Sequence, residues 1–291
     1  MAQAHVLTGA AARPAHPAIR TLAAADLKDA LQKGWADFSA MPSHAIFLCV
    51  IYPIVGIALA QLIFGYAMLP FLFPLAAGFA LIGPIAAIGL YELSRRREAG
   101  LSSEASRSLD VLHSPSIGAI AALGILLMLI FITWLATAHA IYVAYFGYAM
   151  PASIGQFARD VLTTPAGWSL IVVGNLTGFV FAVVVLTISA VSFPLLLDRD
   201  VGAAVALLTS IRVVAENPRI MALWGLIVAA LLLIGSLPFF IGLAVVMPVL
   251  GHATWHLYRK AVDARKCPPA EFRKPPERRR YAADFPTALF G

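Results

Sequence analysis

Long apolar blocks, each nearly free of charge, constrain this chain more than any other feature. About 20 apolar residues are needed to cross a bilayer core roughly 30 Å thick, and several blocks reach that length. The chain is 60% hydrophobic and 12% charged, whereas an ordinary soluble domain is about 45–50% apolar and about 25% charged. The sequence therefore predicts an all-α fold, a polytopic membrane helix bundle.

We expect about six transmembrane helices within residues 21–260. They are Ala45–Phe64, Pro70–Leu93, Ile117–Ala140, Trp168–Leu196, Ile220–Leu237 and Phe239–His256. The last two come from one apolar block, which would be about 60 Å long as a single helix. Pro238 lies near the middle of that block, and because proline breaks helical hydrogen bonding we divide the block there. One long kinked helix, giving five spans, is the alternative.

Positive charge predicts the orientation. With six spans, the outer loops are 65–69, 141–167 and the turn at Pro238, and of the 21 Lys and Arg residues they hold only Arg159. Cytoplasmic loops of membrane proteins carry an excess of Lys and Arg. We therefore expect a multi-pass protein of the bacterial inner membrane with both termini in the cytoplasm. Five spans would instead place the basic C-terminal segment outside.

An internal repeat organises the predicted spans. A proline precedes each odd-numbered span and follows a short, partly amphipathic segment. These prolines are Pro42, Pro115 and Pro218. The ends of two even-numbered spans also match, since Pro84 lies eleven residues before Arg95 and Pro248 lies eleven residues before Arg259. We infer three helical hairpins, each preceded by a short cytoplasmic interfacial helix.

The first of these interfacial segments shows the pattern clearly. Leu27, Leu31, Trp35 and Phe38 fall on one helical face, and Asp37 lies on the opposite, polar side. The sequence thus predicts a helix that rests on the membrane surface with Asp37 away from the apolar side.

Two polar segments flank the predicted bundle. Residues 1–20 contain no long apolar run, so we expect a disordered N-terminal tail and no signal peptide. Residues 261–291 form a basic, proline-containing cytoplasmic tail with too few apolar residues to fold alone. Such a tail is attracted to anionic lipids at the cytoplasmic face. We expect the lipid bilayer and other membrane subunits as partners, and no nucleic acid.

Histidines are the first candidates for chemistry. His252 and His256 are four residues apart and share one face of the last predicted helix, and His44 opens the first span on the same side. Imidazole is a common metal ligand, but the HExxH pattern is absent from the sequence. We interpret the three histidines as hydrogen-bonding residues near the interface, and we expect no metal or cofactor. A haem or metal site is the weaker alternative.

Glu92 is the only acidic residue inside an apolar span. Arg95 and Arg96 follow it by three and four residues, which is within reach for an ion pair on a helix. Intramembrane ionisable residues are also candidates for function, so a proton or ion pathway is the alternative to a structural ion pair.

Asn175 is the most deeply placed strongly polar residue. Gly174 and Gly178 frame it in a pattern of small residues that lets two helix backbones approach closely. We expect the Asn175 amide to form a hydrogen bond across helices, and a contact with a substrate is the alternative.

Two motifs resemble a known family. They are GPIAAIGLYELSRR at residues 83–96 and GHATWHLYR at residues 251–259. Both look like segments of a DUF2189-type family of predicted bacterial integral membrane proteins. The resemblance implies a bacterial source and membership over about Ile19–Asp263. The family carries no assigned activity, so it supports the topology and leaves the function open.

Enzyme signatures are absent from the sequence, including a Walker loop, GxSxG and GxGxxG. We therefore predict no enzyme, but a non-enzymatic accessory, assembly or scaffold subunit of a membrane complex. The alternative is a small-solute or lipid transporter with Glu92, Asn175 and His252 along its path. A continuous polar cavity would favour transport, whereas a dry, leucine-filled centre would oppose it.

Overall fold

The computed structural model describes residues 17–41, 74–75, 83–148, 151, 153–237 and 241–272, and these are mostly helical. The helices are α2 (Ala24–Ala40), α6 (Gly83–Ala86), α7 (Ile88–Glu98), the 3-10 helix η2 (Ala105–His113), α8 (Ile117–Phe146), α9 (Ile154–Thr163), α10 (Pro165–Ser189), α11 (Ser192–Asp198), α12 (Gly202–Glu216), α13 (Pro218–Ser236) and α14 (Leu243–Ala261). Two short strands, β1 (Ala18–Ile19) and β2 (Val262–Asp263), pair antiparallel. The prediction of a helical protein is confirmed.

Three stretches are long and apolar enough to cross a membrane. They are α8, the run Pro165–Asp198 that contains α10 and α11, and α13. These correspond to the third, fourth and fifth predicted spans. The sixth prediction overlaps α14, whose C-terminal half is more polar because it carries His252, His256 and Arg259. The first predicted span lies outside the described residues, as do residues 70–73 and 76–82 of the second, whose C-terminal part is α6 and the start of α7.

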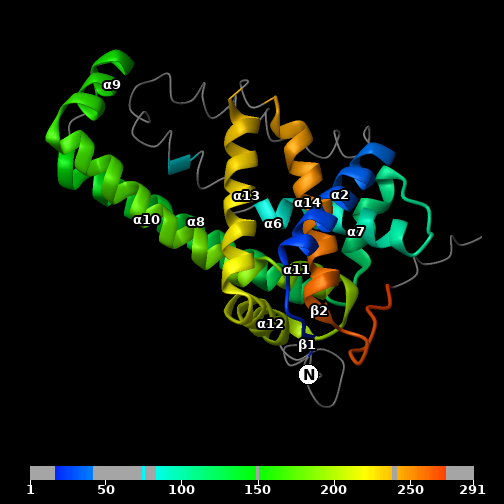
Figure 1. The fold of residues 1–291 in the computed structure, drawn as a ribbon. Coiled ribbons are helices and arrows are strands. Elements are labelled where there is room, and N and C mark those ends of the chain that lie inside the picture. The colour runs from blue at the N-terminus through cyan, green and yellow to red at the C-terminus, as the bar shows by residue number, and fades with distance from the viewer. Residues whose placement is uncertain are drawn as a thin grey trace, which may run out of the picture.

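The last apolar block is two helices. α13 ends at Ser236 and α14 begins at Leu243, and the two helices lie side by side (Figure 1). Gly235 and Gly242 meet closely, since a Cβ on Gly242 would lie 2.7 Å from the Gly235 carbonyl oxygen. The alternative of one long kinked helix is therefore wrong.

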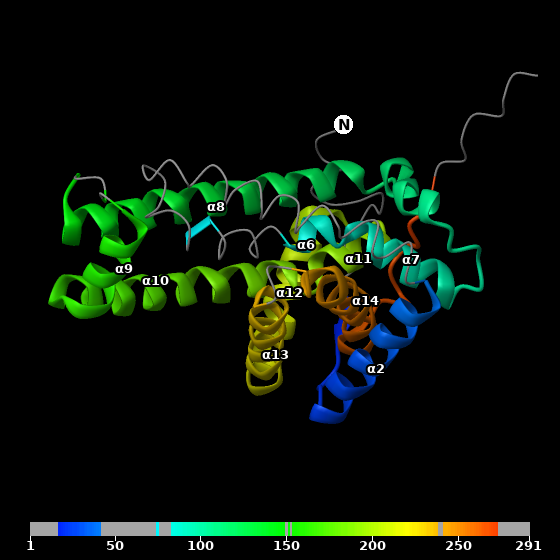
Figure 2. The same cartoon turned by 90° about the horizontal axis from the view of Figure 1, so that it is seen from above.

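The fourth predicted span is divided as well. α10 ends at Ser189, and after a turn at Ala190 and Val191 the chain continues as α11. α10 lies beside α8, and this pair projects away from α13 and α14, with α9 at its far end (Figure 2). By contrast, all six residues from Ser192 to Leu197 are buried. A helix segment buried on every side belongs in the centre of a bundle.

The short helices that precede the prolines pack in a regular order. η2 packs on α7, α12 packs on α10 and α11, and α2 packs on α14. η2 thus contacts the end of the first predicted hairpin, and α12 contacts the end of the second. α2, the first short helix, contacts the end of the third hairpin. The helices α7, α11 and α14 also contact one another. The described chain therefore closes into a ring around these three helices.

The strand pair brings the two ends of the described chain together. β1 pairs with β2, and the Arg20 N–H donates to the Ala261 carbonyl at 2.9 Å. The following segment reaches α11, where the Ala270 N–H donates to the Asp198 carbonyl at 3.0 Å. Residues up to 272 of the predicted C-terminal tail are therefore packed against the helices, while residues 1–16 and 273–291 lie outside the described part.

Candidate functional site

Asp37 is the centre of a polar cluster between α2, α7 and α14. Its carboxylate Oδ2 accepts a hydrogen bond from Ser94 Oγ at 2.6 Å and lies 2.9 Å from His256 Nε2. Its Oδ1 accepts a hydrogen bond from the Arg97 guanidinium at 2.5 Å. Ser94 Oγ also lies 2.7 Å from His252 Nδ1. One carboxylate on α2 therefore joins groups from two other helices.

Close packing of α2 on α14 explains why Asp37 is buried. At Gly34, an added Cβ would lie 2.7 Å from the Ala253 nitrogen and 2.8 Å from the Val249 oxygen. Asp37 follows Gly34 by three residues, so it lies on the same side of α2 and is only 5% exposed. The prediction that Asp37 lies on the outer, polar side of α2 is wrong, because that side is covered by the polar half of α14.

The histidines lie where their spacing predicts. His252 and His256 share the face of α14 that meets α2 and α7, and each lies within hydrogen-bonding distance of a side chain of the Asp37 cluster. Their partners are side chains of neighbouring helices, which the sequence reasoning missed. His44 lies outside the described residues.

Hydrogen bonding keeps Asp37 ionised in spite of its burial. Burial alone raises the pKa of the Asp37 carboxyl. Hydrogen bonds with His256 and Ser94, and the charges of His256 and His252, act in the opposite direction and are larger together, so the pKa lies below its ordinary value. At neutral pH the cluster therefore contains a carboxylate paired with Arg97.

The order of hydrogen bonds argues against nucleophilic catalysis by Ser94. In a Ser–His–Asp triad the imidazole lies between the hydroxyl and the carboxylate, and it takes the serine proton. Here Ser94 lies between His252 and Asp37 and donates its own proton to Asp37. Ser94 and His252 are both 0% exposed. Among the described residues, none is a hydrogen-bond partner of His252 Nε2. The arrangement suits a link between helices.

Glu92 forms the ion pair that its spacing predicts. Arg95 donates to both of its carboxylate oxygens, at 2.7 and 2.8 Å, and Arg96 lies 3.7 Å away. Glu92 is 0% exposed. Arg96 also pairs with Asp110 of η2 at 3.2 Å, and the Arg95 guanidinium lies 4.4 Å from the centre of the Phe272 ring. Glu92 is thus paired as its spacing predicts, and the contacts of its two arginines extend to two neighbouring segments.

A second set of charged residues joins the ends of α7, α11 and α14. Asp198 accepts hydrogen bonds from Tyr258 at 2.6 Å and from Arg259 at 3.3 Å. Glu98 accepts hydrogen bonds from Arg259 at 3.0 Å and from Trp255 at 2.9 Å. The sequence reasoning did not anticipate these contacts, because their partners are between 60 and 161 residues apart.

Asn175 belongs to neither set. It is exposed on α10, and its Nδ2 donates to the Ile171 carbonyl of the same helix at 2.7 Å. A Cβ on Gly178 would lie 3.1 Å from the Trp134 indole of α8, whereas a Cβ on Gly174 would meet no described neighbour within 4 Å. Gly178 therefore lets the two helices approach as expected. The expected hydrogen bond of Asn175 across helices is not made within the described residues.

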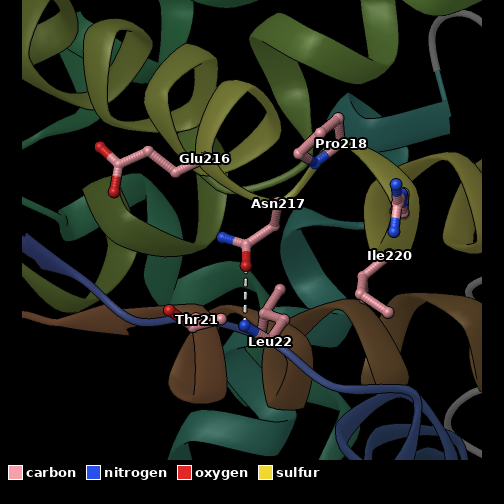
Figure 3. A pocket seen from close by; sticks show the side chains of 7 residues that line it. Thr21, Leu22, Glu216, Asn217, Pro218 and Ile220 are labelled. Atoms are coloured by element: carbon pink, nitrogen blue, oxygen red, sulfur yellow. Dashed lines mark hydrogen bonds between the residues drawn. The ribbon is translucent and has the colours of Figure 1, made fainter.

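A shallow pocket of about 270 Å³ lies where α12 meets α13. It is lined by Thr21, Leu22, Glu216, Asn217, Pro218, Arg219 and Ile220 (Figure 3). Asn217 Oδ1 accepts a hydrogen bond from the Leu22 N–H at 2.7 Å, and its Nδ2 donates to the Arg20 carbonyl at 3.2 Å. Asn217 thus fixes the N-terminal segment to the start of α13. The predicted site residues are not among those that line this pocket.

Metal ligation was the weaker expectation for the histidines. Among the residues that the structure describes, no group of three or more His, Cys, Asp or Glu side chains is placed to hold a metal ion.

A family model matches the middle of the chain. Residues 72–198 match a family described as predicted integral membrane protein, DUF2189. No curated protein and no solved structure matches the chain. The matched range includes the motif at residues 83–96 and is shorter than the range that the resemblance implied. The resemblance is confirmed: this is an integral membrane protein whose residues 72–198 match the DUF2189 family.

Proposed function

We propose that this integral membrane protein is a non-enzymatic accessory or assembly subunit of a larger membrane complex. One observation carries the proposal: the buried polar side chains have side-chain partners, which for Asp37, Ser94 and His252 lie on neighbouring helices. Asp37, Glu92, Ser94 and His252 are each at most 5% exposed, and each lies within hydrogen-bonding distance of a neighbouring side chain. Buried networks with their partners in place rigidify a core, so this supports a structural role.

Packing where α7, α11 and α14 meet favours this role over transport. Leu93, Leu197 and Leu257 occupy matching positions, each two residues before an arginine, and each is 0% exposed. A polar path at this level would have to pass a region filled by leucine. Within the described chain, the packing therefore gives more support to an accessory subunit than to a small-solute or lipid transporter.

We further propose six spans in the bacterial inner membrane, arranged as three hairpins, with both termini in the cytoplasm. In Figure 1, α9 and the C-terminal end of α13 are at the top, whereas α12, β1 and β2 are at the bottom. α9 carries Arg159, the basic residue of the predicted outer loops. The strand end of the molecule carries Arg20, Arg259 and Lys260. This distribution agrees with the excess of positive charge on cytoplasmic loops.

Purification in native lipid patches tests the accessory role. A tagged chain extracted with a membrane-solubilising polymer is weighed by native mass spectrometry. We expect a second membrane protein at fixed stoichiometry. Copies of this chain alone would contradict the proposal. A photo-crosslinking residue at Ile125 or Leu226, which are 63% and 66% exposed, identifies the face that meets the partner.

Cysteine labelling tests the topology separately. In a chain with Cys49 and Cys267 changed to serine, Gln156→Cys on α9 and Ser102→Cys before η2 are each treated with an impermeant maleimide. We expect labelling of position 156 in intact spheroplasts, and labelling of position 102 only in inverted vesicles. The opposite pattern would overturn the orientation.

A further inference from the structure

We propose that two copies of this chain pair through the outer face of α10, with Asn175 at the centre of the contact. The outer face of α10 is defined by Asn175 and five exposed apolar side chains. These are Trp168, Val172, Leu176, Phe179 and Val183, with exposures between 43% and 67%. Their spacing of three and four residues places them in one stripe along the helix. The inference goes beyond the proposed accessory role, which does not require a dimer.

The polar side chain of Asn175 is not explained by a helix face that contacts only lipid. It lies near the middle of α10, which contains no Asp, Glu, Lys or Arg. A carboxamide has two N–H donors and an oxygen that accepts up to two hydrogen bonds. One donor is used by the Ile171 carbonyl. Within the described part of the chain, the second donor and the oxygen have no partner. An unpaired polar group in hydrocarbon is costly.

Thr187 on the same helix shows the contrast. Its hydroxyl donates to the Val183 carbonyl at 2.7 Å, which satisfies its only donor within the helix. A lipid-facing threonine is therefore tolerated without a partner. Asn175 keeps a free donor and a free acceptor after its own intrahelical hydrogen bond, and the two groups require a partner outside the helix.

A second copy of the chain fits this requirement. Across a two-fold axis the same residue meets itself, so the free N–H of each Asn175 donates to the oxygen of the other. A single asparagine within an apolar stripe is also the pattern that fixes pairing between identical helices. The other side of α10 is occupied, because Gly178 contacts Trp134 of α8. The outer face is thus turned away from the helix that α10 already packs on.

The first test compares dimerisation of Asn175→Leu, Thr187→Val and the unchanged chain in lipid vesicles. Each full-length protein carries one fluorophore, and the number of copies per spot is counted by single-molecule photobleaching over a range of dilutions. Interhelical hydrogen bonds in membranes contribute enough for Asn175→Leu to weaken pairing on the order of 10-fold. Thr187→Val removes a polar group whose donor is satisfied within α10, so it should pair like the unchanged chain.

Two results of this experiment would overturn the proposal. One is that the unchanged chain remains single at every dilution. The other is that Asn175→Leu pairs as tightly as the unchanged chain. Leucine suits a lipid-facing position, so loss of pairing in Asn175→Leu with an unchanged melting temperature would report the interface and not misfolding.

Disulfide crosslinking tests which face is used. In the chain with Cys49 and Cys267 changed to serine, Val172→Cys lies beside Asn175 and is expected to give a covalent dimer under mild oxidation in native membranes. Leu226→Cys on α13 is the matched control, since Leu226 is 66% exposed and Val172 is 52% exposed, and it should stay monomeric. A crosslinked product from Val172→Cys whose mass is not twice that of the chain would instead assign this face to a different protein and overturn the proposal.

Discussion

Within residues 165–198 the chain passes between two different environments. Along α10 the apolar side chains point outward, as at Leu176 and Phe179, which are 63% and 67% exposed. Along α11, only a few residues later, Leu195, Leu196 and Leu197 are all 0% exposed. The same residue types are present in both helices. The apolar environment of α10 lies outside the fold of one copy, in lipid or in a second copy of the chain, whereas α12, α7 and α14 supply it for α11.

Polar residues differ between the two regions in the same way. Asn175 on α10 binds its own helix, whereas Asp37, His252 and Asp198 link different helices near α11. Hydrocarbon offers no hydrogen bonds, so the polar groups of a lipid-facing helix bond within that helix or to another protein. The comparison therefore predicts that substitutions near α7, α11 and α14 lower the stability of the fold strongly. Matched substitutions on α10 should change the stability little.

Asp37→Ala is expected to have the largest effect. The substitution leaves Ser94 and His256 without their shared partner, and each buried polar group that loses its hydrogen bond costs about 1–3 kcal/mol. Thermal unfolding in detergent, followed by circular dichroism, should show a much lower melting temperature. Asn175→Ala is the matched change on α10 and should leave the melting temperature nearly unchanged. Equal decreases in melting temperature in the two variants would contradict the difference between the two regions.

Leu197→Ala and Leu176→Ala compare one residue type in the two environments. Truncation of a buried leucine costs about 2–5 kcal/mol, because transfer energy is lost and a cavity remains. We expect about 3 kcal/mol for Leu197→Ala and about 0.5 kcal/mol or less for Leu176→Ala. Chemical unfolding of both variants in the same detergent gives the difference. At dilutions where the chain is monomeric, a cost at position 176 as large as at position 197 would contradict an outer face of α10 that packs on no other part of the same copy.

Gly34→Ala tests the contact that closes the ring. The new Cβ would meet the backbone of α14 at 2.7 Å, and overpacking of this kind costs about 1–3 kcal/mol. Gly174→Ala on α10 meets no described neighbour within 4 Å, and because alanine is the better helix former it should be neutral or stabilising. Limited proteolysis between α2 and the first span should rise only in Gly34→Ala. Unchanged protection in Gly34→Ala would mean that α2 is not held by this contact.

The sequence was sufficient to predict helices and their approximate ends, because apolar length and prolines are local signals. The division at Pro238 and the ion pair of Glu92 were predicted correctly for the same reason, since each depends on residues a few positions apart. The Asp37 cluster was beyond such reasoning. Ser94 is 57 residues from Asp37 and 158 residues from His252, and periodicity alone placed Asp37 on an exposed face. Periodicity describes a helix, but it does not say which neighbour covers its polar side.

Acidification is expected to have the smallest effect, and it follows from the ionisation of Asp37. Burial raises the pKa of Asp37, but its hydrogen bonds with His256 and Ser94 and the charges of His256 and His252 act in the opposite direction, and the net effect lowers the pKa. A group whose pKa is lowered on folding stabilises the fold above its unfolded pKa, and this contribution is lost as the pH falls through the folded pKa. For an aspartate the loss begins below about pH 4.

The difference between the unchanged chain and Asp37→Asn isolates this contribution, because other carboxylates titrate equally in both proteins. Asparagine keeps the shape of aspartate but has no charge to lose. The gap in melting temperature between the two proteins should therefore be constant from pH 7 to pH 5 and narrow below about pH 4. A gap that widens already between pH 7 and pH 5 would mean that protonation of a histidine beside the Asp37 carboxylate, and not the ionisation of Asp37, controls the link between α2 and α14.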